Sequence, residues 1–140
     1  MSNLQVLTAV RGHLLNEEVA PRVHLALPPK AVYPLVLIEL EEIWSPYPLK
    51  GGDKRKVIQA RVKFKVSILS NSPGMEEGIL LSDKVRGALE GTTLGLPENF
   101  LGNRSATIRF LACVAETPGN RDGGQRARVI HHFYDSIIRG

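Results

Sequence analysis

The sequence contains a single cysteine, Cys113, and few aromatic residues, which make up 6% of its 140 positions. One cysteine excludes an internal disulfide and a zinc site of the usual multi-cysteine type. The scarcity of aromatic residues argues against a platform that stacks the bases of single-stranded nucleic acid. Cys113 lies in the apolar segment "ATIRFLACVA", so we expect it to be a small core or near-surface residue.

The chain also lacks the patterns that mark membrane spans, secretion signals and common enzymes. No apolar run approaches the length of a transmembrane helix, and the opening "MSNLQVLTAVRGHLL" has no signal-peptide pattern. We therefore expect no membrane partner and a protein that is made and assembled inside a cell. The stretch "KGGDKRK" lacks the spacing of a phosphate-binding loop, and no nucleophile elbow occurs. We therefore expect that the chain is not an enzyme, that it has no catalytic residues and that it binds no cofactor.

The histidines predict no bound metal. His131 and His132 are neighbours in a predicted strand, where adjacent side chains point to opposite faces and cannot ligate one ion in regular geometry. His13 and His24 have no partner that the sequence reveals.

The charge of the chain is mildly basic and unevenly distributed. The sequence has 18 lysines and arginines against 14 acidic residues, a net charge of +4, and nearly all of the excess follows Gly51. A basic half can bind a polyanion, although surface lysines more often only keep a protein soluble.

The clearest local pattern is "KVIQARVKFKVSIL", residues 56–69, in which apolar and polar residues alternate. A period of two predicts a β-strand with one face in a core and the other toward water or a partner. The polar face carries three evenly spaced cations, Arg61, Lys63 and Lys65. Their purpose is the main question that the sequence raises.

Helical spacing predicts two helices, one of about four turns from Ser2 and one from Ser72, a suitable N-cap, to a stop at Gly91. Further strands are predicted at residues 34–42, 106–114 and 126–138, and a weak one at 23–27. Expected buried faces are Val36, Ile38 and Leu40 in the first of these strands and Ile108, Phe110, Ala112 and Val114 in the second.

These elements predict one α+β domain over residues 1–140, a two-layer fold with a mostly antiparallel sheet of four to five strands and both helices packed on one face. The other face would carry the three cations and Arg109, with Arg128 as a further candidate. A long connection, residues 43–56, interrupts the strands and is a candidate functional loop. Its aromatic and basic residues are Trp44, Tyr47, Lys50, Lys54, Arg55 and Lys56.

Three segments together resemble the tail-terminator, or tail-completion, proteins of long-tailed bacteriophages and related particles such as gene transfer agents. The first is "VHLALPPKAVYPLVLIELEE", with its strand entry Pro34-Leu35-Val36. The second is "VKFKVSILSNSPGMEEGILLSDKVRGALEG", a strand that ends in serine and leads into a helix. "TTLGLPE" follows, and the resemblance covers almost the whole chain.

The resemblance implies a structural virion protein without catalytic residues. Members of the family form a hexameric ring on the head-proximal end of the tail tube, stop tube growth and join the tail to the head–tail connector protein. The implied partners are other copies of the chain, the tail-tube protein and the connector, with DNA passing through the lumen without specific binding. The implied location is the virion tail or neck, and the host cytoplasm during assembly.

One hypothesis answers the question of the three cations. They and the loop from Trp44 to Lys56 would make subunit–subunit or ring–tube contacts, with Trp44 and Tyr47 as energetic anchors. An alternative places the cations at the lumen where DNA passes, which we favour less because strongly basic walls would hold the DNA. In a cyclic ring one subunit's basic patch can meet the next one's acidic patch. The acidic candidates are Glu39 and Glu41, which are expected to share a sheet face, and Glu76 and Glu77.

Two alternatives remain open at this stage. The chain could be another neck or head–tail connector component of the same particles, which sequence separates poorly from a terminator. It could also be a nucleic-acid-binding module that contacts the phosphate backbone through its basic sheet face.

Overall fold

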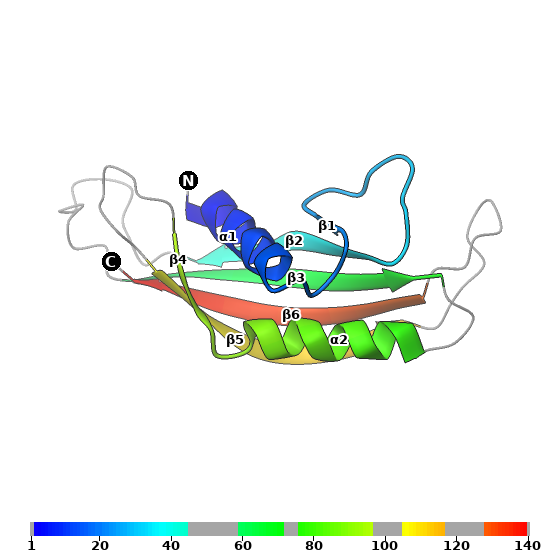
Figure 1. The fold of residues 1–140 in the computed structure, drawn as a ribbon. Helices are drawn as coiled ribbons and strands as arrows, with labels where there is room; N and C mark the ends of the chain where they lie inside the picture. Colours follow the sequence, from blue (N-terminus) through cyan, green and yellow to red (C-terminus); the bar gives the residue numbers. More distant parts are fainter. Residues whose placement is uncertain (1, 45–58, 72–75, 97–104, 117–127, 140) are drawn as a thin grey trace.

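The computed structural model of the chain describes residues 2–44, 59–71, 76–96, 105–116 and 128–139. Two helices, α1 (Ser2–Asn16) and α2 (Glu76–Leu89), accompany six strands (Figure 1). The strands are β1 (Val23–His24), β2 (Leu35–Trp44), β3 (Gln59–Ser70), β4 (Thr93–Gly95), β5 (Ser105–Glu116) and β6 (Arg128–Arg139).

All six strands belong to one sheet in the order β1-β2-β3-β6-β5-β4. Every neighbouring pair is antiparallel except β1 and β2, which are parallel. The predicted α+β class and the mostly antiparallel sheet are confirmed, but six strands replace the expected four to five. The added strand is β4, and the weak strand predicted at residues 23–27 is shorter, as β1.

Both helices pack on one face of the sheet, as predicted. Helix α1 contacts β2, α2 contacts β3 and β6, and the two helices touch each other. Leu7, Val10 and Leu14 of α1 are buried against the sheet, as are Leu81 and Val85 of α2. Their spacing of three or four residues aligns them on one side of each helix, which explains why these two segments are helical.

The alternating residues of β3 form the centre of the core. Val62, Phe64, Val66 and Ile68 are at most 1% exposed beneath the helices. Phe64 stacks on Tyr134 of β6, with ring centroids 5.4 Å apart. The alternation of "RVKFKVSI" thus marks a strand with one buried face, as predicted, because successive side chains of a strand point to opposite faces of the sheet.

The C-terminal end of α2 is fixed by glycine. Gly91 has a φ of 75°, in the left-handed region that side chains with a Cβ rarely adopt, and it follows the helix as predicted. Its amide donates to the carbonyl of Ile108 at 2.9 Å, and the amide of Ile108 donates to Thr92 at 2.9 Å. The helix end is therefore tied directly to β5.

Two β-bulges overturn predictions that assumed uninterrupted alternation. A bulge between Phe110 and Ala112 shifts the register of β5, so Val114 is 50% exposed instead of sharing the buried face of Ile108. Ala112 is exposed for the same reason. Cys113, expected to be a core or near-surface residue, is also exposed.

A second bulge lies between Leu40 and Glu42 of β2. Leu40 is opposite the buried Phe64 but is 40% exposed, so its predicted burial is wrong. The physical reason is position: among the described residues, β1 pairs only with Val36 and Leu37, and the rest of β2 has no neighbour on its outer side.

Candidate functional site

The candidate site is the sheet face opposite the helices, which we call the helix-free face. The pairing register aligns its outward residues in rows across β2, β3, β6 and β5. Two neighbouring rows carry most of its charge. They are Glu39, Lys65, Phe133 and Ala112, followed by Glu42, Lys63, Asp135 and Arg109.

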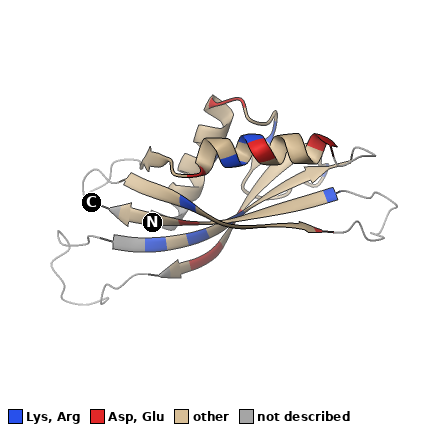
Figure 2. Cartoon of the chain, turned by 90° about the horizontal axis from the view of Figure 1, so that it is seen from below, with Lys and Arg blue, Asp and Glu red and all other residues tan. Residues whose placement is uncertain are grey.

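The lysines of β3 are paired with glutamates of β2 in the same chain. The Lys65 Nζ lies 3.6 Å from Glu39 Oε1, and the Lys63 Nζ lies 3.8 Å from Glu42 Oε2. Figure 2 shows these acidic and basic residues side by side on the two strands. Because all four side chains are at least one quarter exposed, each pair contributes less than about 1 kcal/mol to stability.

Asp135 is the buried anion of the helix-free face. Its side chain is 1% exposed and accepts two hydrogen bonds from Arg109, one from Nε at 3.1 Å and one from Nη2 at 2.6 Å. Arg61 Nε lies 3.8 Å from its Oδ2. Hydrogen bonding to this carboxylate raises the pKa of the Arg109 guanidinium. Two arginines from different strands thus cover one buried carboxylate.

Charge on the helix-free face is balanced. Its outward charged residues with described side chains are four acids and four bases: Glu39, Glu42, Glu116 and Asp135 against Arg61, Lys63, Lys65 and Arg109. The charged rows of this face therefore alternate acidic and basic residues across the strands, while Leu35, Leu69 and Val129 form an apolar cluster at one end of the face. This weakens the case for a sheet that binds nucleic acid by its cations, because phosphate binding requires uncompensated positive charge.

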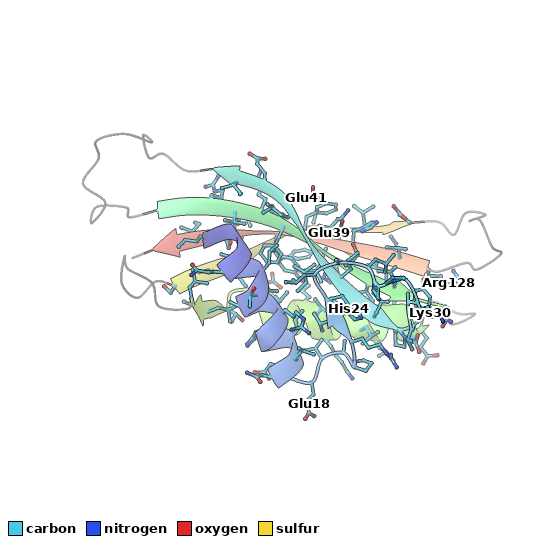
Figure 3. All side chains as sticks on the ribbon, turned by 90° about the horizontal axis from the view of Figure 1, so that it is seen from above. Glu18, His24, Lys30, Glu39, Glu41 and Arg128 are labelled. Carbon is cyan, nitrogen blue, oxygen red and sulfur yellow. The ribbon has the colours of Figure 1, made fainter. Side chains whose placement is uncertain are left out.

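The structure modifies the predicted set of acidic partners. Glu39 lies on the predicted face, but because of the bulge in β2 it shares that face with Glu42, opposite Lys63, and not with Glu41 as alternation predicted. Glu41 is the bulge residue and is exposed near Glu39 on the outer strand (Figure 3). Pairing of these cations with acids of a neighbouring subunit stays a prediction, and within one chain Glu39 already fills that role.

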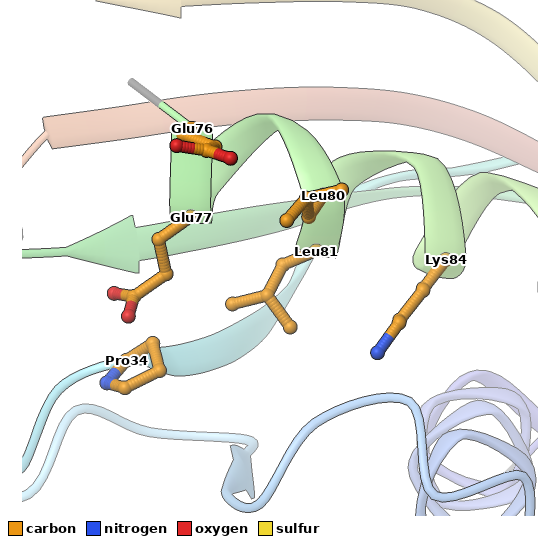
Figure 4. Close-up of a pocket in the computed structure, with 6 residues that line it drawn as sticks. All are labelled: Pro34, Glu76, Glu77, Leu80, Leu81 and Lys84. Atoms are coloured by element: carbon orange, nitrogen blue, oxygen red, sulfur yellow. The ribbon is translucent and has the colours of Figure 1, made fainter. Parts of the chain in front are cut away.

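Glu76 and Glu77 lie elsewhere, at the start of α2 (Figure 4). Glu77 Oε1 accepts a hydrogen bond from Ser70 Oγ at 2.5 Å, which joins the helix start to the end of β3. Both line an open pocket of about 420 Å³ with Pro34, Leu80, Leu81 and Lys84. The helix dipole also favours these carboxylates, which is enough to explain their presence in the first turn.

Most of the predicted loop candidates lie outside the described residues. These are Tyr47, Lys50, Lys54, Arg55 and Lys56. Trp44 is the last residue of β2 and pairs with Arg61, so the strand continues into the segment expected to be a loop. The structure does not describe the Trp44 side chain. Its anchoring role therefore stays a prediction.

One end of the helix-free face contains a chain of hydrogen bonds with the composition of a catalytic triad. Ser67 Oγ lies 2.8 Å from His131 Nδ1, and His131 Nε2 lies 3.0 Å from Glu116 Oε1. Ser67 is 2% exposed and sits within a strand that is paired on both sides, so its backbone amide belongs to the sheet. A nucleophile needs access and donors for an oxyanion, so this arrangement favours a structural role.

A buried polar network connects α2 to the sheet. His132 is 1% exposed, its Nε2 lies 2.5 Å from Ser82 Oγ, and its Nδ1 lies 2.9 Å from Tyr134 Oη. Burial, together with the nearby Arg86 charge, lowers the pKa of His132 to about 4, and Asp83 partly opposes this shift. His131 and His132 do point to opposite faces, as predicted. Among the described residues, no three His, Cys, Asp or Glu side chains gather to hold a metal ion.

Sequence reasoning missed Asp135, Glu42 and the His132 network. Asp135 sits in "HHFYDSII", where it reads as one polar residue in an imperfect alternation. Its importance depends on two arginines from other strands, so the local pattern carries no signal for it. Glu42 was missed because the extra residue Glu41 moves it onto the face of Glu39; the two adjacent acids in "IELEEIW", which interrupt the alternation, are the sequence signal of this bulge.

The chain shares its fold with solved structures of low sequence identity. A chain from the virion of native gene transfer agent (GTA) particle superposes with a TM-score of 0.65 at 20% identity, covering 97% of this chain and 96% of that chain. A second solved structure gives a TM-score of 0.56 at 13% identity, with coverage of 97% and 96%. No protein-family model and no curated protein matches the chain. Neither described helix is long and apolar enough to cross a membrane.

Proposed function

We propose that this chain is a structural virion protein of the tail-terminator type, which closes the head-proximal end of a tail tube as a ring. The observation that carries the proposal is the fold shared along almost the full length of a GTA virion component. The sequence resemblance points to the same kind of particle. Neither depends on a catalytic group, and the proposed role is not enzymatic.

The helix-free face fits a surface that DNA passes without being held. Its basic side chains pair with Glu39, Glu42 and Asp135 within the sheet. A strongly basic wall would bind the phosphate backbone and oppose sliding, whereas a surface with equal numbers of acidic and basic residues would not. In this proposal the partners are further copies of the chain, the tail-tube protein and the head–tail connector. Assembly takes place in the host cytoplasm and the product resides in the tail or neck.

The ring is tested by native mass spectrometry of the purified chain across a concentration series, with and without the matching tail-tube protein. The proposal expects a closed hexamer, alone or nucleated on tube ends. A chain that stays monomeric under both conditions contradicts it.

The same fold likeness also supports a second candidate, another neck or connector component. Localisation of gold-labelled chain separates the two by electron microscopy. A terminator binds the end of isolated tubes without any connector present. A connector component binds capsid portals and leaves isolated tube ends bare.

A further inference from the structure

We propose that neighbouring copies join edge to edge, with β2 of one copy pairing antiparallel to β5 of the next, so that the ring closes through a continuous sheet. The inference rests on the proposed ring and names the surface that builds it. The partner is a second copy of this chain.

Both outer long strands present free backbone edges in the described part of the chain. Strand β1 covers β2 only at Val36 and Leu37, which leaves residues 38–44 uncovered. Strand β4 covers β5 at residues 105–107, and Ile108 bonds Gly91 and Thr92, which leaves residues 109–115 uncovered among the described residues. A long uncovered edge is a template for pairing with another strand.

These two edges also carry exposed apolar side chains. Of the nine large apolar residues that are exposed among those described, four lie on the uncovered edges: Leu40 at 40%, Ile43 at 50%, Leu111 at 41% and Val114 at 50%. Exposed apolar groups that gather along a strand edge mark a contact surface more often than scattered ones do.

The directions of the two edges suit a head-to-tail ring. Strand β2 is antiparallel to β3, β3 to β6 and β6 to β5, so β2 and β5 run in opposite directions on opposite sides of the sheet. When a copy is repeated by rotation about an axis along the strands, β5 meets the next β2 in antiparallel orientation. Such a contact is heterologous and closes into a ring.

The bulges make the two edges equal in length where they would meet. Glu39 and Ala112 lie in one row of the sheet, and Glu42 and Arg109 lie in the next. Between these two rows β2 has the extra residue Glu41 and β5 has the extra residue Leu111, so the two bulges lie at the same height along the strands. Level pairing therefore needs no further bulge and places Leu40 of one copy opposite Leu111 of the next. It sets residues 38–42 of one copy against residues 113–109 of the next, the stretch in which both edges are uncovered.

The chemistry of the facing side chains is complementary in this register. Arg109, whose side chain is 61% exposed, uses Nε and Nη2 for Asp135 and keeps Nη1 for another acceptor. Glu42 of the next copy, 60% exposed, would lie directly opposite it. An apolar pair beside a charge pair fixes one register, since slippage would separate both.

The pairing is tested by disulfide trapping in a Cys113→Ser background, which removes the exposed native thiol. The test variant carries Leu40→Cys and Leu111→Cys, at two exposed sites outside the buried core. Directly opposed residues of antiparallel strands have Cα atoms about 4.5–5.5 Å apart, within disulfide reach. The matched control carries Leu40→Cys with Ala115→Cys, about 13 Å further along β5. Each single-cysteine variant is oxidised in parallel.

Oxidation of the test pair is expected to give a ladder of cross-linked species up to the full ring, while the control pair and single variants stay monomeric on denaturing gels. Native mass is recorded for every variant. A native ring that gives no ladder overturns the edge pairing and leaves the proposed function standing. A dimer from Leu111→Cys alone would show β5 pairing with itself, which also overturns it. Absence of any native ring, both for the chain alone and with the tail-tube protein, overturns both.

Discussion

Arg109 and Asp135 face each other across β5 and β6, and the guanidinium donates two hydrogen bonds to a carboxylate that is 1% exposed. Arg61 approaches the same carboxylate from β3. Three strands are thereby tied together at the centre of the helix-free face. A buried carboxylate is tolerated only with such partners, so the observed register is the one in which Asp135 keeps both arginines.

Replacing Asp135 is expected to be much more damaging than removing a surface pair. Asp135→Ala leaves Arg61 and Arg109 without their shared anion and should lower the free energy of unfolding by about 2–3 kcal/mol. The control Lys63→Ala breaks only an exposed pair with Glu42 and should cost less than about 1 kcal/mol. Urea unfolding measures both. Equal effects would mean that Asp135 does not organise the sheet.

Stability is expected to fall as the pH drops from 6.5 toward 4. His132 has a pKa lowered from 6.5 to about 4 by burial, so below pH 6.5 the unfolded chain binds a proton that the folded chain does not. The loss from His132 reaches about 3 kcal/mol at pH 4 and levels off below that, as the folded chain takes up the proton too. His132→Gln removes this titration and should flatten the stability profile in that window. If the variant keeps the same dependence of stability on pH, titration of His132 does not cause that dependence.

Two glycines near the end of α2 are expected to respond to alanine in opposite directions. A Cβ meets nothing within 4 Å at either Gly87 or Gly91, so space does not distinguish them. Gly87 lies inside the helix, where alanine should raise the free energy of unfolding by about 0.4–1 kcal/mol. Gly91 has a φ of 75°, so alanine there should lower the free energy of unfolding by about 1 kcal/mol. Thermal unfolding of the two variants measures the difference, and shifts of the same sign would contradict the account.

The chain is expected not to retard duplex DNA at physiological salt, because the basic residues of the helix-free face are balanced by acidic residues on the same face. The double variant Glu39→Gln, Glu42→Gln removes the partners of Lys65 and Lys63 and should retard DNA at low salt. Gel retardation across a salt series measures both proteins. Tight binding by the unmodified chain would support the alternative of a nucleic-acid-binding module.

How much the sequence predicts follows from how regular each element is. Strand β3 and helix α2 were predicted closely because their buried residues recur at constant spacing. Strand β4 has three residues, too few to show a period, and β5 departs from alternation after its bulge. The predicted cations lie on the helix-free face, but the burial of Asp135 depends on strands far away in the sequence, and no local pattern encodes it.

The measurement that tests the central claim most directly is the length distribution of tail tubes assembled from the matching tube protein with and without this chain, read by electron microscopy. The account predicts shorter tubes as the chain is added, each with one end closed by a ring that stops further growth. Tubes of unchanged length, with the chain absent from their ends, would contradict it.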